Sequence, residues 1–423
     1  MYYYDRLDNG LQIIASRMPE KASLSLGVMV SVGGRYETPK QAGISHLVEH
    51  MLFKGTKNRT TKQIKESVEG VGGVLNAYTD EEATCYFVKV LKEHLDVSLK
   101  VLSDMVQNPL FDAKELSRER TVVLEEIKMY LDLPSHYVHD LIGTLLWPNQ
   151  PMGQLLAGDE KTVSGITKKN LVDFVKQNYH PKNFIVSVCG DFVFEEIREK
   201  IQKCFPENSA RKKSNFKKAF VSQKKPQTLF MHRKTEQTHF AIGFHGFSQQ
   251  DPKRYKAALL NVILGGNMSS RLFDELREKR GLAYEIKSGL STYEDTGSFT
   301  ISAGVETKKT EASLELILKQ LEKIKNKPVG KLELKRAKDY MLGQFCMSLE
   351  DTLDQMTWIA EKALYGKSVP TQEEIKQHVE KVTVQDIQDV ANEIFKNSRL
   401  NLALIGPISD KQKNNIKKNF RLK

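Results

Sequence analysis

An internal repeat constrains the fold of this chain more than any other feature of its sequence. A helical pattern that starts at Ile166 and leads into the strand pattern 184–191 recurs from Val382 to the strand pattern 400–407. The two segments align without a gap at a constant offset of 216 residues, close to half of the 423-residue chain. Such self-similarity indicates an internal duplication. We therefore expect an α+β protein with two homologous α/β domains, each a mainly antiparallel sheet packed with helices.

A basic, proline-flanked stretch lies between the two repeats and carries only one acidic residue, Glu207. Its cations are Arg211, Lys212, Lys213, Lys217, Lys218, Lys224 and Lys225. Such composition is typical of an interdomain linker. The sequence thus predicts an N-terminal domain over residues 1–206, a linker over 207–226 and a C-terminal domain over 227–423, a division that suits the length of the chain.

Period and turn signals predict the elements of the first domain. Strands are expected at 11–15 and 25–32, a helix starting at Thr61, a glycine-led strand at 72–79 with an antiparallel neighbour at 84–90, and helices between Glu93 and Tyr130 that break at Asn108-Pro109. Between the second strand and Thr61 lies an amphipathic run that contains His46-Leu47-Val48-Glu49-His50.

Two histidines and a carboxylate within five positions favour a metal site. On a helix, His46 and His50 are separated by four residues, so their imidazoles lie on one face and can share one zinc ion. Glu49 lies beside that face, where it can take a proton from a water molecule bound to the ion. The alternative is a helix with two partly exposed histidines and a solvated glutamate, which the motif alone does not exclude.

A zinc site with two histidines needs a further ligand, commonly a carboxylate or a histidine. The helix expected after Asp112 carries Glu115, Glu119 and Glu126 on nearly one face. Taken alone, this strip reads as a solvated helix face. Beside an incomplete metal motif, it is the first place to look for the missing ligand.

The second half has no matching histidine pair. Its counterpart of the histidine helix is expected near residues 268–274, where no histidine occurs, so we expect one metal site per chain. The following segment, Arg277 to Tyr284, carries no feature that physical chemistry alone would single out.

Composition limits the classes of protein to which this chain can belong. The hydrophobic fraction of 40% and the charged fraction of 28% are those of a soluble globular protein. No apolar run is long enough for a membrane span, and the N-terminus lacks the pattern of a secretion signal, which favours a cytoplasmic protein or a processed organellar one. The net charge of +11 is spread without clustered aromatics, so we expect no nucleic-acid partner. The four scattered cysteines are expected to be reduced thiols.

Taken together, the chain resembles the pitrilysin family of zinc peptidases, also called inverzincins, and within it the short branch that includes mitochondrial processing peptidase. The resemblance covers nearly the whole sequence. It rests mainly on His46 to His50 and on the segment 118–127, and less strongly on 75–79 and 277–284.

The resemblance implies a role for each matching residue. His46, His50 and Glu126 would hold one Zn²⁺, Glu49 would be the general base, and Glu119 would support the site. Arg277 and Tyr284 match a pair that holds the substrate backbone and the developing oxyanion.

The resemblance also implies a clamshell dimer that encloses an extended peptide, and we expect a homodimer. Asn76 and Ala77 would belong to the edge strand that pairs with the peptide, and Phe53 would line the pocket after the scissile bond. Where processing peptidases carry several acidic residues for a basic substrate, this chain offers only Asp140, which speaks against strict specificity for a basic residue. The rival interpretation is a non-catalytic scaffold subunit of the same fold.

Overall fold

The structure, a computed structural model, describes residues 2–206, 211–366 and 369–422. Residues 207–210 of the expected linker lie outside this part. The chain forms two compact units, each assembled from three segments. The first unit contains Met1–Lys128, Gln154–Lys217 and Cys346–Pro370, and the second contains Met129–Gly153, Lys218–Phe345 and Thr371–Lys423.

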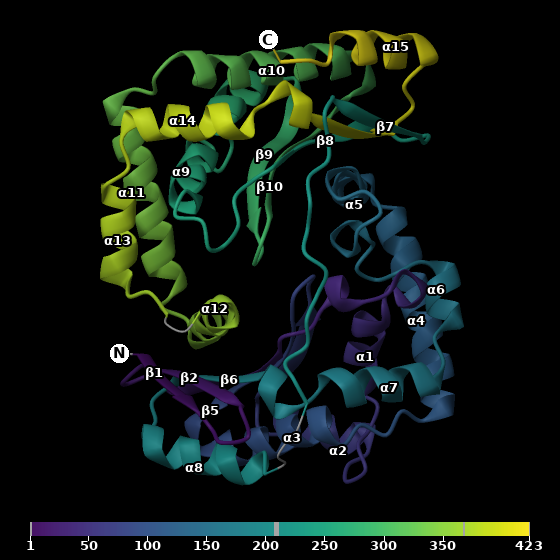
Figure 1. The fold of residues 1–423 in the computed structure, drawn as a ribbon, viewed down its shortest axis with the longest axis vertical. Coiled ribbons are helices and arrows are strands. Elements are labelled where there is room, and N and C mark those ends of the chain that lie inside the picture. Colours follow the sequence, from purple (N-terminus) through teal and green to yellow (C-terminus); the bar gives the residue numbers. More distant parts are fainter. Residues whose placement is uncertain (1, 207–210, 367–368, 423) are drawn as a thin grey trace. The chain divides into compact units, whose positions relative to one another are not determined.

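A six-stranded sheet forms the centre of the first unit (Figure 1). Its strands are β1 (Tyr2–Arg6), β2 (Gln12–Arg17), β3 (Ser23–Val30), β4 (Val74–Thr79), β5 (Thr84–Leu91) and β6 (Phe184–Gly190), in the order β1-β2-β6-β3-β5-β4. Only the pairing of β2 with β6 is parallel. The strand β4 therefore forms one open edge of the sheet.

The second unit repeats this topology. Its strands are β7 (Gln227–His232), β8 (Gln237–His245), β9 (Ala283–Thr292), β10 (Gly297–Glu306) and β11 (Asn401–Gly406), in the order β7-β11-β8-β10-β9. In chain order these strands correspond to β2 through β6, and the only parallel pairing, β7 with β11, again joins the first and last of them. The duplicated, mainly antiparallel α/β architecture predicted from the repeat is confirmed.

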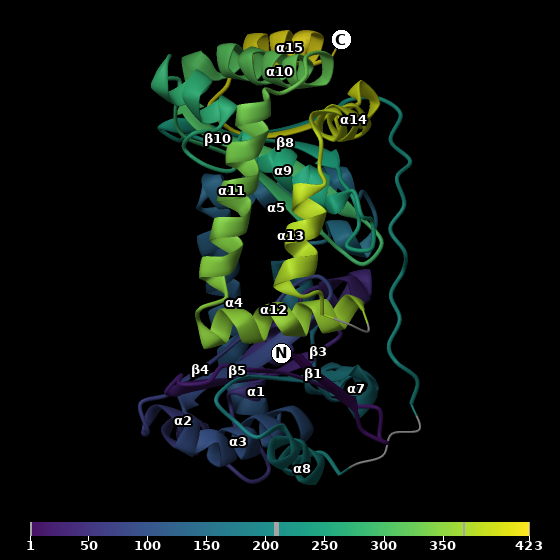
Figure 2. The same cartoon turned by 90° about the vertical axis from the view of Figure 1, so that its left-hand side faces the viewer.

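Each half of the sequence contributes one helix to the other half's sheet. The helix α12 (Thr352–Tyr365) packs its buried face, including Met356 and Ile359, against Ile14 and Met29 of the first sheet. Gly27 permits this close approach, since a Cβ atom there would lie 2.5 Å from the sulfur of Met356. Figures 1 and 2 show α12 along one face of this sheet, with α3 (Leu95–Gln107) and α8 (Phe194–Cys204) on the other.

The helix α5 (Pro134–Leu146) makes the reciprocal contact in the second unit. Its Val138, Ile142 and Leu146 pack with Ala241 and with β11. The compact units therefore differ from the continuous division at residues 206 and 227, because residues 129–153 and 346–370 bury their apolar faces on the sheet encoded by the other half.

The remaining helices have the following bounds. In the first unit they are α1 (Ile44–Leu52), α2 (Thr61–Glu69), α4 (Ala113–Leu131, whose last turn belongs to the second unit), α6 (Glu160–Gly165) and α7 (Lys168–Asn178). In the second unit they are α9 (Arg254–Leu264), the π-helical turn Phe273–Glu278, α10 (Thr310–Asn326), α11 (Lys331–Ser348, which ends in the first unit), α13 (Gln372–Glu380), α14 (Val384–Ile394) and α15 (Asp410–Asn419).

The helix α2 starts at Thr61 as expected. Thr60 caps it, because its hydroxyl accepts a hydrogen bond from the Gln63 amide and the Gln63 side chain accepts one from the Thr60 amide. One local prediction needs correction. In element order the second-half counterpart of the histidine helix is α9, not residues 268–274, because α9 is the first helix after β8 as α1 is after β3. Like the expected segment, α9 contains no histidine.

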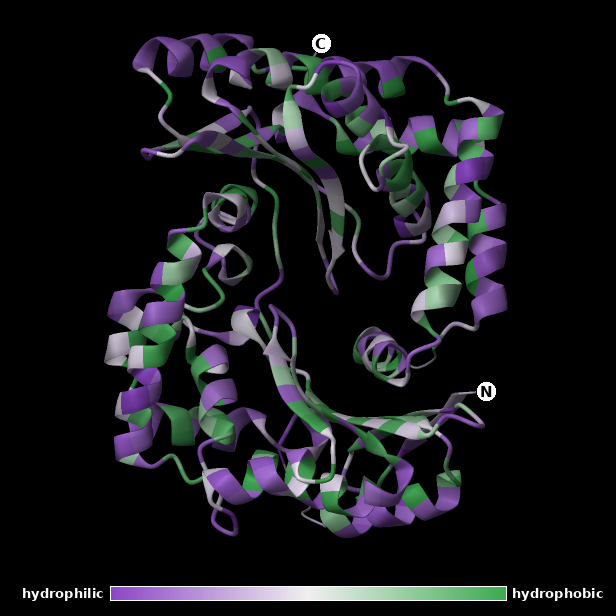
Figure 3. Cartoon of the chain, turned by 180° about the vertical axis from the view of Figure 1, so that it is seen from behind, coloured by the Kyte–Doolittle hydropathy of each residue, from purple (hydrophilic) through white to green (hydrophobic). Residues whose placement is uncertain are grey.

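Hydrophobic residues concentrate on the strands and on the helix faces turned toward them, whereas hydrophilic residues cover the outer helix faces (Figure 3). None of the helices in the described part of the chain combines the length and the apolar character that crossing a bilayer requires.

Candidate metal centre

The helix α1 is anchored at its N-terminus by a buried carboxylate. Glu37 accepts hydrogen bonds from the backbone amides of Gly43 and Ser45, both at 2.7 Å. Amides of a first helical turn have no partner within the helix, so this carboxylate satisfies them from outside. Gly43 adopts a φ of +90°, and a Cβ atom there would lie 2.5 Å from the carbonyl oxygen of Ala157. These contacts fix where the helix begins and the direction in which it runs.

The packing of α1 leaves one of its faces partly exposed. Six of its nine residues are buried, namely Ile44, Ser45, Leu47, Val48, Met51 and Leu52. The other three, His46, Glu49 and His50, are half-buried and lie on the remaining face. The imidazole rings of His46 and His50 have centroids 4.7 Å apart. The spacing that predicts a shared face thus brings the two rings together.

The helix α4 supplies carboxylates to this face. Its buried residues are Leu116, Glu119, Val123 and Ile127, so the side that carries Glu119 packs inward. Glu126, two turns further along, reaches both imidazoles: its Oε2 lies 3.5 Å from Nε2 of His50 and 3.8 Å from Nε2 of His46. Glu115, the third member of the predicted strip, pairs instead with Arg118 at 2.7 Å.

The arrangement of His46, His50 and Glu126 suits a single metal ion. One ligand atom from each residue lies within 4.8 Å of the other two, the only such group among the described residues. Zinc binds histidine nitrogen and carboxylate oxygen at about 2.0–2.2 Å, which separates the ligand atoms of one tetrahedral ion by roughly 3.5 Å. Two nitrogens and one oxygen also match the donor sets of catalytic zinc, which keep a fourth position open.

Burial and neighbouring charges shift the pKa values of the three residues in this cluster in different directions. Burial, followed by the neighbouring His50, lowers the pKa of His46 to about 4, so His46 is neutral at pH 7 and available as a ligand. Burial also acts to lower the pKa of His50, but its bonds to Glu126 and Glu119 outweigh this effect and raise the pKa. The bond to His50 lowers the pKa of the Glu126 carboxyl and keeps it ionised.

A second carboxylate orients His50 from behind. Oε2 of Glu119 lies 3.2 Å from Nδ1 of His50, where it can accept a hydrogen bond from Nδ1–H and leave the Nε2 lone pair, on the side of Glu126, for a metal ion. His46 lacks this support, since its buried Nδ1 has no hydrogen-bond partner in the described part of the chain. Lys54 Nζ lies 2.7 Å from the other oxygen of Glu119. Lys54 thus contacts Glu119, and Glu119 in turn contacts His50.

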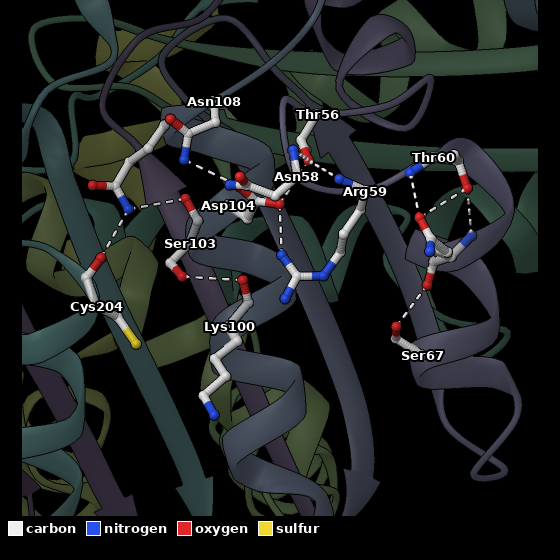
Figure 4. A network of polar contacts seen from close by, with 12 residues as sticks. Thr56, Asn58, Arg59, Thr60, Ser67, Lys100, Ser103, Asp104, Asn108 and Cys204 are labelled. Atoms are coloured by element: carbon white, nitrogen blue, oxygen red, sulfur yellow. Dashed lines mark hydrogen bonds and ion pairs between the residues drawn. The ribbon is translucent and has the colours of Figure 1, made fainter.

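The loop that follows Lys54 is held by Asp104 of α3 (Figure 4). The Asp104 carboxylate is buried and accepts bonds from Thr56, Asn58 and Arg59, each at 2.6 Å, and from Asn108 at 3.0 Å. Burial works against ionisation of Asp104, but these donors outweigh it and lower its pKa. The network ties the exit of α1 to a buried helix and so restricts where Lys54 can lie.

Glu49 points toward the edge strand β4. Its Oε2 accepts a hydrogen bond of 2.5 Å from the hydroxyl of Thr79, the last residue of that strand. Burial raises the pKa of the Glu49 carboxyl, partly opposed by the Thr79 bond. A carboxyl group with a raised pKa beside this cluster is better suited to accept a proton than one with an ordinary pKa.

The other predicted site residues fall into two groups. Phe53 ends α1 and lies against the ring of Tyr86, while Asn76 and Ala77 lie on β4, so all three belong to the first unit with the histidines. Arg277 and Tyr284 belong to the second unit, where the guanidinium of Arg277 lies over the rings of Phe273 and Tyr284 at 4.7 and 4.9 Å from their centroids. Asp140 is exposed on α5 of the second unit.

No pattern in the sequence indicates a role for Thr79 or Lys54. Both lie inside conspicuous stretches, directly after Leu75-Asn76-Ala77-Tyr78 and after Phe53. Their partners, Glu49 and Glu119, are remote in sequence, and no local period connects them.

Comparison with known families matches both halves of the chain. The family model described as "Insulinase (Peptidase family M16)" matches residues 12–160, which include both histidines and Glu126. The model described as "Peptidase M16 inactive domain" matches residues 165–341.

Relatives and solved structures align over nearly the full length. "Uncharacterized zinc protease YmxG" of Bacillus subtilis is 36% identical over 94% of this chain and 97% of its own, and an "Uncharacterized zinc protease" of Rickettsia felis is 36% identical over 95% and 97%. The crystal structure of a protease from Helicobacter pylori has a TM-score of 0.90 at 26% identity, covering 96% of this chain and 99% of that one. A structure from Pseudomonas fluorescens described as a peptidase M16 inactive domain has the same fold, with a TM-score of 0.89 at 20% identity over 97% and 98%.

The Lys54 contact predicts a measurable effect on metal affinity. Lys54→Met removes the cation that holds Glu119 against His50, so the dissociation constant of the metal-depleted protein for Zn²⁺, measured by competition with a chromophoric chelator, should rise about 10-fold. Lys62→Met, whose side chain is 81% exposed on α2, serves as the matched control and should leave the constant unchanged. Equal constants for the two variants would show that Lys54 does not act on the cluster.

Proposed function

The chain belongs to peptidase family M16, and we propose that it is a zinc-dependent endopeptidase that hydrolyses peptides or unfolded polypeptide segments. The observation that carries this proposal is the cluster of His46, His50 and Glu126 with the Glu49 carboxyl beside it. One Zn²⁺ per chain is the proposed cofactor, because the donor set suits it and the relatives are named zinc proteases.

The proposed reaction assigns a task to each side chain. His46, His50 and Glu126 hold the zinc ion, which when bound polarises the scissile carbonyl and makes water acidic enough to attack near neutral pH. As the oxygen of the attacking water bonds to the carbonyl carbon, Glu49 takes a proton from that water. When the carbon–nitrogen bond breaks, Glu49 passes that proton to the leaving amine.

Charge develops on the carbonyl oxygen during this attack, and cationic or hydroxyl donors stabilise it. We assign this task to Arg277 and Tyr284. The contact of the Arg277 guanidinium with two aromatic rings supports the assignment, because it limits the conformations of a side chain that must present its donors in a fixed direction.

The peptide is proposed to bind in extended form along β4. Among the described strands, β4 pairs only with β5, so it forms an open edge of its sheet, the surface to which an additional strand can hydrogen-bond. Asn76 and Ala77 lie along this edge, and Phe53 lies at the end of the histidine helix. Asp140 is retained as a weaker candidate for contact with a basic substrate residue.

We further propose that the working form is a homodimer enclosing the peptide, with Arg277 and Tyr284 of one chain serving the metal site of its partner. No role for nucleic acid or a membrane span is proposed, and a cytoplasmic location is kept as the simplest expectation.

A non-catalytic subunit of the same fold is the competing function. One family model and one structural relative carry the word "inactive" in their descriptions, which favours this alternative. Against it stands the complete set of ligand-type residues together with a base-type carboxyl.

The role of Glu49 is tested by Glu49→Gln. The amide cannot accept a proton, so kcat on a fluorogenic peptide library should fall by about 10³-fold or more while the zinc content stays at one per chain. The matched control is Glu125→Gln, an exposed neighbour of Glu126 that pairs only with Lys128 among the described residues and should keep the parental rate. Cleavage by Glu49→Gln at the parental rate would contradict the proposal.

The dimer is tested by co-expression of two inactive variants. Glu49→Gln lacks the base and Tyr284→Phe lacks the proposed hydroxyl, and each alone should be about 10²-fold or more below the parent. In mixed dimers one of the two sites regains both groups, and random pairing makes about half of all dimers mixed, so the co-expressed protein should recover about a quarter of the parental activity. A mixture no more active than its components would show that the two groups act within one chain, whereas a Tyr284→Phe variant as active as the parent would show that Tyr284 has no role.

A further inference from the structure

The main-chain amide and carbonyl groups of β4 point alternately toward β5 and toward the open edge of the sheet. The amide of Ala77 donates to the side-chain oxygen of Asn76 at 2.9 Å, so it is not directed at β5. The amide of Asp80 bonds to the Ala83 carbonyl across the turn, on the β5 side. Because direction alternates along a strand, the main-chain groups of Thr79 face the open edge together with those of Ala77.

The side chain of Thr79 faces the histidine helix. On β4, Tyr78 packs with Phe87 and Cys85 on the face covered by α12, so Thr79 projects from the opposite face. There its hydroxyl donates the bond of 2.5 Å to Glu49. Among the described residues, Thr79 is the only hydrogen-bond donor to the Glu49 side chain.

The two ends of β4 are held differently. Beyond Thr79, the carbonyl of Asp80 accepts the Gly34 amide at 3.0 Å, and the Asp80 carboxylate accepts the amides of Glu82 and Ala83 at 2.7 and 2.6 Å. The other end follows Gly72, which has a φ of +77° and open space around the position of a Cβ atom, and Gly73, whose amide donates one hydrogen bond to the Val68 carbonyl at 3.0 Å. A partner strand would therefore add order mainly before Thr79, in the segment that leads into it.

From this geometry we propose that Thr79 is a positioning residue that couples strand addition at β4 to the placement of the Glu49 carboxylate. A peptide that pairs with Ala77 displaces the Asn76 side chain from the edge and extends the hydrogen-bond ladder to Thr79. The ladder orders the segment that leads into Thr79 and so narrows the orientations of its hydroxyl, which holds Glu49 where it meets the attacking water.

This coupling makes extended peptides better substrates through kcat as well as through KM. A peptide too short to reach along β4 leaves Thr79 and Glu49 less ordered, even when its scissile bond lies at the metal. Since a displacement of about 1 Å at a catalytic group can cost about 100-fold in rate, the effect is large enough to measure. The inference rests on the proposed peptidase function.

The test compares kcat and KM for peptides that share one scissile bond and lengthen stepwise in the direction of strand pairing. In the zinc-loaded parent, kcat should rise with length. In Thr79→Val, which keeps the branched shape and loses the hydroxyl, kcat on the longest peptide should be about 10–100-fold lower and should no longer depend on length. Thr79→Ser keeps the hydroxyl and should restore both the rate and the length dependence.

Two further measurements separate positioning from folding or binding. Zinc content should be unchanged in both Thr79 variants, and the longest peptide should bind Glu49→Gln and Glu49→Gln/Thr79→Val with the same Kd. Thr121→Val, an exposed substitution on α4, is the matched control for loss of a threonine hydroxyl and should behave as the parent.

The inference fails if Thr79→Val keeps the parental kcat and length dependence, or if Thr79→Ser is impaired as much as Thr79→Val. A parent that cleaves none of the peptides overturns the proposed function and the inference with it. An active parent whose Thr79→Val variant is equally active overturns the inference alone.

Discussion

The local architecture depends on holding two imidazoles and a carboxylate close enough to share one ion. Their ligand atoms lie within 4.8 Å of one another, on two helices that come from separate parts of the chain. Each helix is also held in place by contacts outside this cluster. Glu37 fixes the start of α1, the Asp104 network fixes the loop after it, and the buried face of α4 fixes the direction of Glu119. The polar cluster is thus placed by apolar packing and by buried hydrogen bonds around it.

Duplication explains why one chain has two similar sheets and one such cluster. The sheets share a strand order, yet α9, the counterpart of α1, carries no histidine. The first unit keeps the groups suited to metal binding and proton transfer, whereas the second carries the stacked Arg277. Because α5 and α12 each pack on the sheet encoded by the other half, each sheet depends on the other half of the sequence for one of the helices that cover it. The two halves have diverged in chemistry while keeping their dependence on each other for packing.

Sequence patterns predicted much of this arrangement, and the reasons are local. The spacing of His46 and His50 defines a helical face, and the same period brings Glu119 and Glu126 to one side of α4. The exchange of α5 and α12 was not predicted, because a helical period shows which face is apolar but not which sheet covers it. The Thr79 to Glu49 bond joins residues 30 positions apart, and the Lys54 contact with Glu119 likewise depends on tertiary packing. The roles of Arg277 and Tyr284 came only from the family resemblance.

The proposed zinc ligands, His46, His50 and Glu126, can be checked by anomalous diffraction recorded on both sides of the zinc absorption edge from crystals of zinc-loaded protein. One strong peak per chain is expected, at about 2.0–2.2 Å from one nitrogen of each histidine and from an oxygen of Glu126. A zinc-loaded crystal with no peak at these residues, or with its only peak elsewhere, would rule out this set of ligands.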